Sequence, residues 1–531
     1  MKNATKLKKA ATNKTKVTDE VINLNRKLLA AMTPDLVKTG CVGVDENFIL
    51  LTDSYKIGHW KMMVAGTTNS FAYFESRKGA KYPYTVCFGL QMYLKKYFAG
   101  IVVNQADIEE ADIFFKEHFG IDMFNRKMWE YIVNECGGKL PIRIKCAPEG
   151  TPVPISNVLI TVENTGPELT EPLTEALTNY IETILTHFWL PSNVATISRD
   201  IKVYLKRAFD ASSDNLGKLP FMLHDFGFRG IGSIEGAGLA GAGHLVNFMG
   251  TDTLQAITYT QRYYGKKGIR EGGRYKGGMM TGYSVPATEH SVMTAKGEEG
   301  ELEIWREVIR QFLKGILSIV ADSYNIERVI KEYLPALKVE IIARDGTIVI
   351  RPDSPRSKDD SAAAQVLWLA NSLGGIFGYK VNNKGYMVLE PHIGLIYGDG
   401  LSVDEIKECI KTLVLAGWSA ETCVYGMGGG LLQKHNRDTQ RSAFKCSAQK
   451  RDGKWINVSK KPLDPTKVSK AGRLKLVWNE GAHGKTLITV QESDPRPDVL
   501  VTVFENGKVT KEYNWEEVRA NAEAKLLEEI Y

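Results

Sequence analysis

The stretch Ile393-Gly-Leu-Ile-Tyr397, followed by Gly398-Asp399-Gly400, decides the fold class of this chain of 531 residues. Its apolar run has the length and uninterrupted hydrophobicity of a strand that is buried on both faces, as in a parallel sheet. Shortly after it, Ser402-Val-Asp-Glu405 forms a capping box, and the amphipathic run that it opens ends near Gly417. The segment therefore predicts a strand, a polar tip and a helix in immediate succession.

The same succession recurs from about residue 219 to residue 430. A second helix is expected over Ala362–Leu373, stopped by Gly374-Gly375. Further apolar runs also end abruptly in Asp, Gly or a charged residue: Phe221–Leu223 before His224-Asp225, Leu317–Val320 before Asp322, Thr347–Ile350 before Arg351-Pro-Asp353, and Thr422–Tyr425 before Gly426. This repetition predicts an α/β fold, either a (β/α) barrel or a doubly wound sheet. In both architectures the polar tips gather at the carboxyl ends of the strands, where active sites form. One such tip is usually an ordinary turn, but five charge-rich tips favour a site.

The remainder of the chain predicts a second unit of a different kind. Strand-like runs such as Phe71–Phe74 and Val158–Val162 alternate with turns and a few helices. We expect an α+β domain from residues 46–190 together with 430–531, and a barrel-like catalytic domain over 191–429. Residues 1–45 are expected to be a basic, disordered tail, because the first eighteen residues carry six Lys, no acid and no apolar block. A transit peptide is the weaker alternative, since the positive charge of these eighteen residues is all Lys with no Arg.

Composition excludes several classes of protein. A net charge of +6 is small for this length and the basic residues are spread along the chain, so no nucleic-acid partner is expected. No window approaches the roughly 20 uninterrupted apolar residues of a membrane span, and the N-terminus is not a secretory signal. The seven cysteines are scattered and never form a CxxC pair, which argues against disulfides or zinc. The composition predicts a soluble, cytoplasmic protein.

Candidate phosphate-binding groups cluster around the predicted tips. Gly426-Met-Gly-Gly-Gly430 could present its backbone amides to an anion, although a glycine run is more often a flexible turn. The spacing of Gly230 to Gly236 is wrong for a dinucleotide fingerprint, and the stretch ending in Gly484-Lys485-Thr486 lacks the first glycine of a P-loop. Basic residues that could grip phosphates recur here: Arg229, Arg351, Arg437, Lys445, Lys460, Lys461 and Lys467. Nearby acids could bind ribose hydroxyls or Mg²⁺: Asp322, Asp353 and Asp399.

His290 is the candidate for covalent or acid–base chemistry. It follows Glu289 in a turn-rich stretch that begins at Gly282. A lone histidine is usually structural, but one beside a carboxylate in a loop is a fair candidate for nucleophilic or proton-transfer work. No metal-ligand spacing surrounds it, so metal ligation by His290 is not expected.

Several of these motifs occur together in one order along the chain. They are Leu51-Thr-Asp53-Ser-Tyr55-Lys, Leu223-His-Asp-Phe226-Gly-Phe-Arg229-Gly, Asn247-Phe-Met-Gly-Thr-Asp252-Thr, the stretch from Gly282 through His290-Ser, Ile350-Arg351-Pro-Asp353-Ser, Gly398-Asp399-Gly400, and Gly428-Gly-Gly-Leu-Leu-Gln-Lys. From about residue 48 to the C-terminal helix, the chain resembles the nicotinamide phosphoribosyltransferase family. The resemblance implies an irregular (β/α) barrel of the phosphoribosyltransferase kind. It also implies a condensation of nicotinamide with phosphoribosyl pyrophosphate that gives nicotinamide mononucleotide and pyrophosphate.

The resemblance assigns roles residue by residue. It implies that the nicotinamide ring stacks between Phe226 and Arg351, and that Asp252 holds the carboxamide. It places the ribose at Asp353, Gly398 and Asp399, the ribose phosphate at Gly428, Gly429 and Arg437, and pyrophosphate at Arg229, His290 and Arg351. Asp53 and Asp322 are further expected substrate-binding residues, and Asp322 and Asp353 are the expected ligands of Mg²⁺. ATP would phosphorylate His290. A homodimer is implied, in which the other subunit contributes Tyr55, Arg77, Lys445, Lys460 and Lys467.

Departures from the family pattern and alternative functions remain. The segment Gly265–Gly282, with seven glycines and five basic residues, is longer than the family's loop and suggests a mobile lid. Met427 stands where Ser is expected, and Thr288 where Ala is expected. A nicotinate or quinolinate phosphoribosyltransferase is the nearest alternative, and Asp252 argues against it because a carboxylate repels a substrate carboxylate. A catalytically silent interaction protein and a nucleic-acid binder that uses the tail are more distant alternatives.

Overall fold

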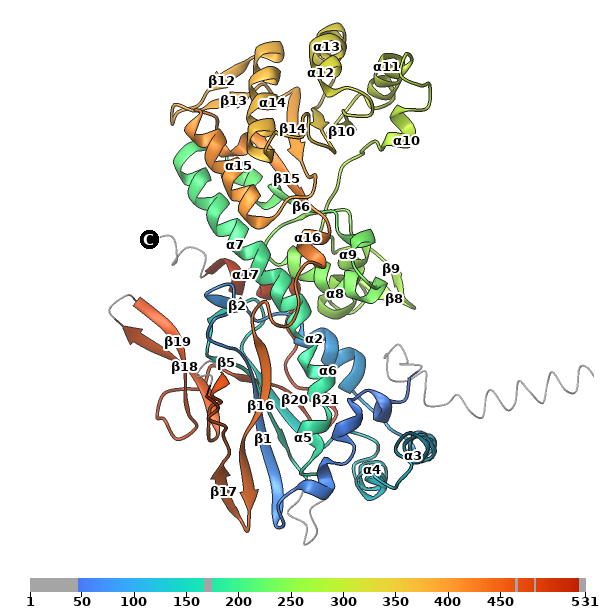
Figure 1. Cartoon of the computed structure of the whole chain (residues 1–531), viewed down its shortest axis with the longest axis vertical. Helices are drawn as coiled ribbons and strands as arrows, with labels where there is room; N and C mark the ends of the chain where they lie inside the picture. Colours follow the sequence, from blue (N-terminus) through green and yellow to red (C-terminus); the bar gives the residue numbers. More distant parts are fainter. Residues whose placement is uncertain (1–45, 167–173, 464–466, 482–483, 525–531) are drawn as a thin grey trace, which may run out of the picture.

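The chain folds around two sheets, a parallel one in the upper half of Figure 1 and an antiparallel one in the lower half. The computed structural model describes residues 46–166, 174–463, 467–481 and 484–524. The predicted tail, residues 1–45, lies outside the described residues. No helix within the described ranges is both long and apolar enough to cross a bilayer.

The parallel sheet has the strand order β10-β11-β14-β15-β6-β7, and each neighbouring pair is parallel. Its strands are β6 (Leu223–Asp225), β7 (Gly250–Thr251), β10 (Leu317–Val320), β11 (Ile348–Arg351), β14 (Ile393–Tyr397) and β15 (Cys423–Met427). The predicted strands are therefore present. One begins two residues late, because Phe221 still belongs to a 3₁₀ turn that contains Pro220.

An extended segment joins the two edges of this sheet. Tyr283 forms a parallel bridge with Gly250 of β7, and Ala287 forms one with Ser318 of β10. The backbone N–H of Thr251 donates to the carbonyl of Tyr283 at 2.9 Å. The N–H of Ser318 donates to the carbonyl of Pro286, also at 2.9 Å. This closure confirms the irregular (β/α) barrel and decides against an open doubly wound sheet.

Helices cover the outside of the barrel: α8 (Ile234–Leu245), α9 (Leu254–Tyr264), α11 (Glu301–Gln311), α12 (Ile326–Arg328), α13 (Leu334–Ile342), α14 (Ala362–Phe377) and α15 (Val403–Leu415). The predicted capping box opens α15, where the Glu405 N–H donates to the Ser402 hydroxyl at 3.2 Å. The predicted stop at Gly374-Gly375 is wrong, because α14 continues to Phe377. Gly374 instead allows close packing, since a Cβ there would lie 2.7 Å from the ring of Trp418.

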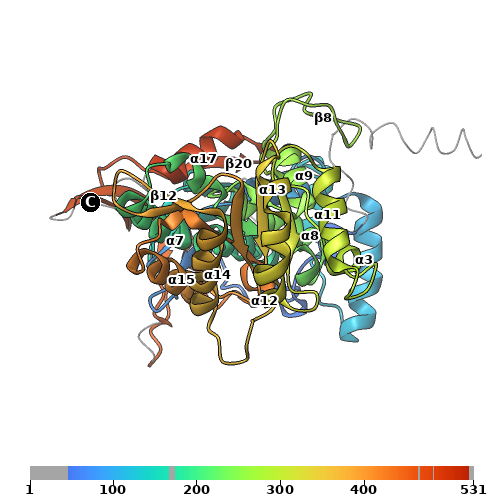
Figure 2. The same ribbon diagram turned by 90° about the horizontal axis from the view of Figure 1, so that it is seen from above.

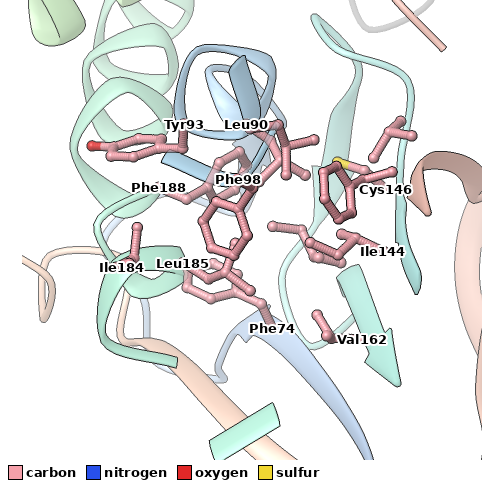
Figure 3. Packing of buried hydrophobic residues seen from close by; sticks show 14 of the residues in the cluster. Phe74, Leu90, Tyr93, Phe98, Ile144, Cys146, Val162, Ile184, Leu185 and Phe188 are labelled. Atoms are coloured by element: carbon pink, nitrogen blue, oxygen red, sulfur yellow. The ribbon is translucent and has the colours of Figure 1, made fainter. Parts of the chain in front are cut away.

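The second sheet interleaves strands from the two ends of the chain, as predicted for the α+β part. Its order is β17-β16-β1-β5-β3-β20-β21, and its pairings are antiparallel. The strands are β1 (Thr67–Ser76), β3 (Ile142–Cys146), β5 (Val158–Asn164), β16 (Ser442–Arg451), β17 (Lys454–Asn457), β20 (Val501–Glu505) and β21 (Lys508–Val509). Figure 3 shows its core, where the rings of Phe74 and Phe188 pack edge to face with 5.4 Å between their centroids.

Within the described residues, further α-helices and four two-stranded pairings lie outside the two main sheets. The remaining helices are α2 (Leu90–Tyr93), α3 (Gln105–Phe119), α4 (Arg126–Asn134), α5 (Leu177–Tyr180), α6 (Glu182–Thr186), α7 (Trp189–Ser212), α10 (His290–Met293), α16 (Gly429–Leu432) and α17 (Trp515–Ala524). The remaining strands pair as β2 (Tyr84–Val86) with β4 (Pro152–Pro154), β8 (Arg270–Glu271) with β9 (Arg274–Tyr275), β12 (Tyr379–Val381) with β13 (Met387–Leu389), and β18 (Leu474–Gly481) with β19 (Gly484–Gln491). The long helix α7 packs against α8 and α15 of the barrel and against β2, so it ties the two parts together.

The segment Gly265–Gly282 contains the β8–β9 hairpin. Figure 2 shows this hairpin standing out from the body of the molecule. Its base is held by Gln261, whose amide donates to the carbonyl of Met279 at 2.9 Å and whose oxygen accepts from Arg270 at 2.8 Å. A lid role for this hairpin stays a prediction.

Candidate active site

A cavity of 1210 Å³ opens at the carboxyl ends of the barrel strands. It is lined by tips that follow β6, β7, β11, β14 and β15, together with the start of α10. The predicted site residues that it brings together are Phe226, Arg229, Asp252, His290, Arg351, Asp353, Gly398, Asp399, Gly428 and Gly429. The polar tips meet because the strands are parallel, so their ends share one edge of the sheet.

Phe226 gives the cavity an aromatic surface that rests on glycine. A Cβ added to Gly426 would lie 2.1 Å from ring atom Cε2, and one added to Gly398 would lie 3.1 Å from it. The backbone N–H of Phe226 also donates to the carbonyl of Met427 at 2.8 Å. The ring is therefore fixed against the neighbouring strands, and its position depends on two residues without side chains.

Arg351 ends β11 and retains donor capacity toward the cavity. One of its terminal nitrogens donates to the carbonyl of Thr288, while its buried Nε has no hydrogen-bond partner within the described part of the chain. A buried N–H without a hydrogen-bond partner is costly unless a ligand satisfies it. The Thr288 hydroxyl accepts from the N–H of Val320 at 2.9 Å, which gives a structural reason for threonine at this position.

Asp252 stands exposed at the cavity, just beyond β7. Its backbone N–H donates to the carbonyl of Asp225 at 2.9 Å. One carboxylate oxygen accepts from the hydroxyl of Ser284. The rest of the carboxylate faces the cavity as a hydrogen-bond acceptor. Ser284 was not among the predicted site residues, although it lies in the motif that contains His290.

His290 lies between two carboxylates. Its Nε2 is 3.3 Å from Asp322 Oδ1, and its Nδ1 is 3.9 Å from Asp353 Oδ2. The Asp322 carboxylate is nearly buried and also accepts from the hydroxyl of Ser354, whereas the His290 side chain is 45% exposed. Burial raises the pKa of Asp399, and the negative charges of Asp353 and Asp322 raise it further. This side of the cavity is therefore rich in negative charge and suited to a bound cation or to hydroxyl groups.

The acidic residues of the site suit Mg²⁺ only in combination with other ligands. No group of three or more His, Cys, Asp or Glu side chains with metal-binding geometry occurs among residues 46–166, 174–463, 467–481 and 484–524. Mg²⁺ is often held by one or two carboxylates together with water and substrate phosphates. Asp322 and Asp353 fit this arrangement, in which water and substrate phosphates supply the remaining ligands.

Two glycine-rich segments face each other at the cavity. A Cβ on Gly230 would lie 3.2 Å from the backbone nitrogen of Gly429, and the N–H of Gly232 donates to Gln433 Oε1 at 3.0 Å. The segment around Gly230, whose spacing does not match a dinucleotide fingerprint, lines the site together with Ser233. The sequence feature that could have indicated this lining role is Ser233, a polar residue that caps the N-terminus of α8.

The other predicted residues lie outside this lining. Asp322 contacts the lining residue His290. The residues that are not part of the cavity lining are Asp53, Tyr55, Arg77, Arg437, Lys445, Lys460 and Lys467. Tyr55 is 62% exposed on a turn that follows Asp53, and Asp53 accepts from the hydroxyl of Thr183 at 2.7 Å.

Four of these residues form a basic cluster, which we define as Arg77, Arg437, Lys445 and Lys460. Burial lowers the pKa of Lys445, and the positive charges of Lys460, Arg77 and Arg437 lower it further, against the opposing charge of Glu182. The antiparallel sheet creates the cluster, because β1 and β16 pair up to Ser76 and Ser442 and so bring the segments of Arg77 and Arg437 together. Repelling cations held this close suit an anionic partner.

Comparisons with known proteins agree with this geometry. The sequence profile of the nicotinate phosphoribosyltransferase (NAPRTase) family matches residues 221–508, and that of the N-terminal domain of nicotinamide phosphoribosyltransferase matches residues 47–144. The chain is 42% identical over 491 residues to the nicotinamide phosphoribosyltransferase of Xanthomonas campestris pv. campestris (strain 8004), covering 91% of this chain and 99% of that protein. It is 33% identical over 405 residues to the nicotinamide phosphoribosyltransferase of Acinetobacter baylyi (strain ATCC 33305 / BD413 / ADP1), covering 72% and 76% of the two chains.

Solved structures share the fold at low sequence identity. Nicotinate-nucleotide pyrophosphorylase from Pyrococcus furiosus superposes with a TM-score of 0.55 at 14% identity, covering 92% of this chain and 97% of that one. Human nicotinic acid phosphoribosyltransferase gives a TM-score of 0.50 at 15% identity, covering 90% and 94%. Fold, site and sequence together define an enzyme of the phosphoribosyltransferase class, a pentosyltransferase. The chain belongs to the nicotinate phosphoribosyltransferase family.

Proposed function

We propose that this enzyme condenses nicotinamide with phosphoribosyl pyrophosphate, giving nicotinamide mononucleotide and pyrophosphate in NAD salvage in the cytoplasm. The preference for nicotinamide is inferred from Asp252, whose exposed carboxylate lines the same cavity as Phe226 and Arg351. A carboxylate accepts a hydrogen bond from a carboxamide NH₂ but repels the carboxylate of nicotinate. The names of the bacterial relatives support the same substrate.

The residues present suit a substitution at the ribose. The ring nitrogen of nicotinamide forms a bond to the anomeric carbon as the bond to the pyrophosphate oxygen breaks, and pyrophosphate leaves with both electrons. Positive charge develops on the ribose, near Asp353 and Asp399, while the leaving group gains negative charge beside Arg229 and Arg351. Stacking between Phe226 and Arg351 would aim the flat ring at that carbon. Mg²⁺, held by Asp322 and Asp353 with the pyrophosphate, would supply further neutralisation of the leaving group.

His290 is proposed to accept a phosphoryl group from ATP. An imidazole nitrogen would form a bond to the γ-phosphorus as the bond to the bridging oxygen breaks, releasing ADP. The half-exposed ring and its position between Asp322 and Asp353 support this role, since the carboxylates can orient the imidazole. The phosphohistidine would tighten pyrophosphate binding through Mg²⁺ and the arginines, and so couple ATP hydrolysis to synthesis.

A homodimer with shared sites is proposed because the predicted phosphate-binding residues are divided within one chain. The basic cluster and Tyr55 are not among the residues that line the chain's own cavity. A second subunit that presents them to this cavity would complete the cation set around three phosphate groups.

Product formation from labelled nicotinamide and labelled nicotinate tests the proposed function directly. Both bases are offered at equal concentration with phosphoribosyl pyrophosphate and Mg²⁺, with and without ATP. We expect nicotinamide mononucleotide as the main product and more of it with ATP. Preferential formation of nicotinate mononucleotide would show the alternative activity, and absence of both products would show a catalytically silent protein.

A further inference from the structure

The buried side chain of Asp225 connects two loops of the site without reaching the cavity. Asp225 is the last residue of β6, and its exposed fraction is 0%. Side chains alternate along a strand, so Asp225 points away from the cavity that Phe226 lines. It points toward α8, where a Cβ on Gly241 would lie 3.2 Å from Asp225 Oδ2.

The Asp225 carboxylate bonds to both loops. Its Oδ1 accepts from the backbone N–H of Gly227 at 2.7 Å, and its Oδ2 lies 3.4 Å from the hydroxyl oxygen of Thr251, which donates to it. Gly227 belongs to the loop that carries Phe226 and Arg229, and Thr251 directly precedes Asp252. Together with the bond from the Asp252 N–H to the Asp225 carbonyl, these contacts join the ring-binding loop to the carboxamide-binding residue.

Asp225 makes these contacts without a compensating cation. Within the described residues no ion pair to it is found, and the charge that acts on it most directly is the negative charge of Asp252. Burial raises the pKa of Asp225 to about 6, and the N–H of Gly227 opposes that shift. An ionised acceptor holds an N–H more strongly than a neutral one does. The carboxylate is thus costly in stability, and the bond to Gly227 is the contact that its charge strengthens.

We infer that Asp225 is a positioning residue that sets Asp252 and the Phe226–Arg229 loop in register, and thereby sharpens the choice of nicotinamide over nicotinate. The inference rests on the proposed function of Asp252. Among the described residues, the side chain of Asp252 is held by the hydroxyl of Ser284 alone, so its placement depends on the backbone that Asp225 and Thr251 fix. A displacement of about 1 Å at a reacting or recognition group is enough for a large loss in efficiency.

The test measures the ratio of kcat/KM for nicotinamide and for nicotinate in four variants. Asp225→Asn keeps the shape of the side chain but removes its charge. Thr251→Val removes the hydroxyl that donates to Asp225 and also accepts from the backbone N–H of Thr253 at 3.0 Å. The other two are Asp252→Asn and the double variant Asp225→Asn/Asp252→Asn, which complete a double-mutant cycle. Asp225→Asn and Thr251→Val should each lower the ratio by about tenfold. The double variant should have the ratio of Asp252→Asn alone, because Asp225 acts through Asp252.

Glu149→Gln is the matched control. Glu149 is also a buried carboxylate, and it accepts from the N–H groups of Gln91 at 2.7 Å and Gly89 at 3.2 Å and from the hydroxyl of Tyr264 at the end of α9. It lies in the antiparallel-sheet part and, among the described residues, bonds to neither Phe226 nor Asp252. Its variant should lose thermal stability and keep the substrate ratio. An unchanged ratio in both Asp225→Asn and Thr251→Val overturns the inference, as does an equal fall in Glu149→Gln or full additivity in the cycle. Failure of the proposed function is distinct, because the wild type itself would then not prefer nicotinamide.

Discussion

The ring of Phe226 lies against Gly426 so closely that a single methyl group on Gly426 would stand 2.1 Å from the ring. The position of the Phe226 ring in the cavity therefore depends on the neighbouring strand β15, to which Gly426 belongs. We expect Gly426→Ala to displace the ring and to lower kcat/KM for nicotinamide by at least about tenfold. Gly394→Ala in β14 is the matched control, since a Cβ there would meet its neighbours at 3.4 Å or more. Equal activity of the two variants would show that the ring position is unimportant.

Asp252→Asn is expected to weaken discrimination between the two bases. The amide can donate to the carboxylate of nicotinate, and the repelling charge is lost. The ratio of kcat/KM for nicotinamide and nicotinate should fall by about one to two orders of magnitude. An unchanged ratio would mean that Asp252 does not read the carboxamide.

His290→Ala should abolish ATP hydrolysis and ATP stimulation while leaving slow synthesis without ATP. Incubation of the wild type with γ-labelled ATP should give an acid-labile protein label that the variant lacks. His392→Ala is the control, because His392 precedes β14 at the opposite end of the barrel strands. ATP stimulation of a wild type that takes no label would place the action of ATP elsewhere.

Mixing two inactive variants tests the shared site. Tyr55→Ala and Asp252→Ala are combined in equal amounts under conditions of subunit exchange. If Tyr55 acts in the other subunit, each hybrid dimer has one intact site, and about one quarter of wild-type activity should return. Lack of recovery, with hybrid dimers demonstrated by differential tagging, would contradict the shared site.

His244 should make the protein less stable as the pH falls. Its buried ring lies 3.0 Å from the hydroxyl of Ser198 and 2.9 Å from the carbonyl of Gly250, and burial lowers its pKa to about 3. The unfolded chain, with an ordinary histidine pKa near 6.5, binds more protons between about pH 3 and 6.5, so the stabilising contribution is complete above that window and is lost below it. Between pH 7.5 and 5.0 the wild type should lose about 2 kcal/mol more unfolding free energy than His244→Gln, measured by denaturant unfolding. Equal losses would show that His244 does not titrate in this way.

The strands of the barrel and the polar tips could be predicted because their signals are local. An apolar run such as Ile393–Tyr397 and a capping box such as Ser402 to Glu405 act within a few residues, and both appear in the structure. Local signals failed where tertiary packing competed with them. Gly374-Gly375 suggested a helix end, but the close approach of Trp418 uses Gly374 inside the helix.

The sequence by itself determined the fold class, the order of the motifs and therefore the family, because these depend on hydrophobic runs, turn residues and particular residue types at fixed places along one chain. Tertiary structure alone decided that the segment Tyr283–Thr288 closes the barrel, that the segment around Gly230 lines the cavity, and that Asp225 reaches both Gly227 and Thr251. It also separated Tyr55 and the basic cluster from the chain's own cavity. These relationships join residues far apart along the chain, and only the packing of strands and helices against one another sets such distances.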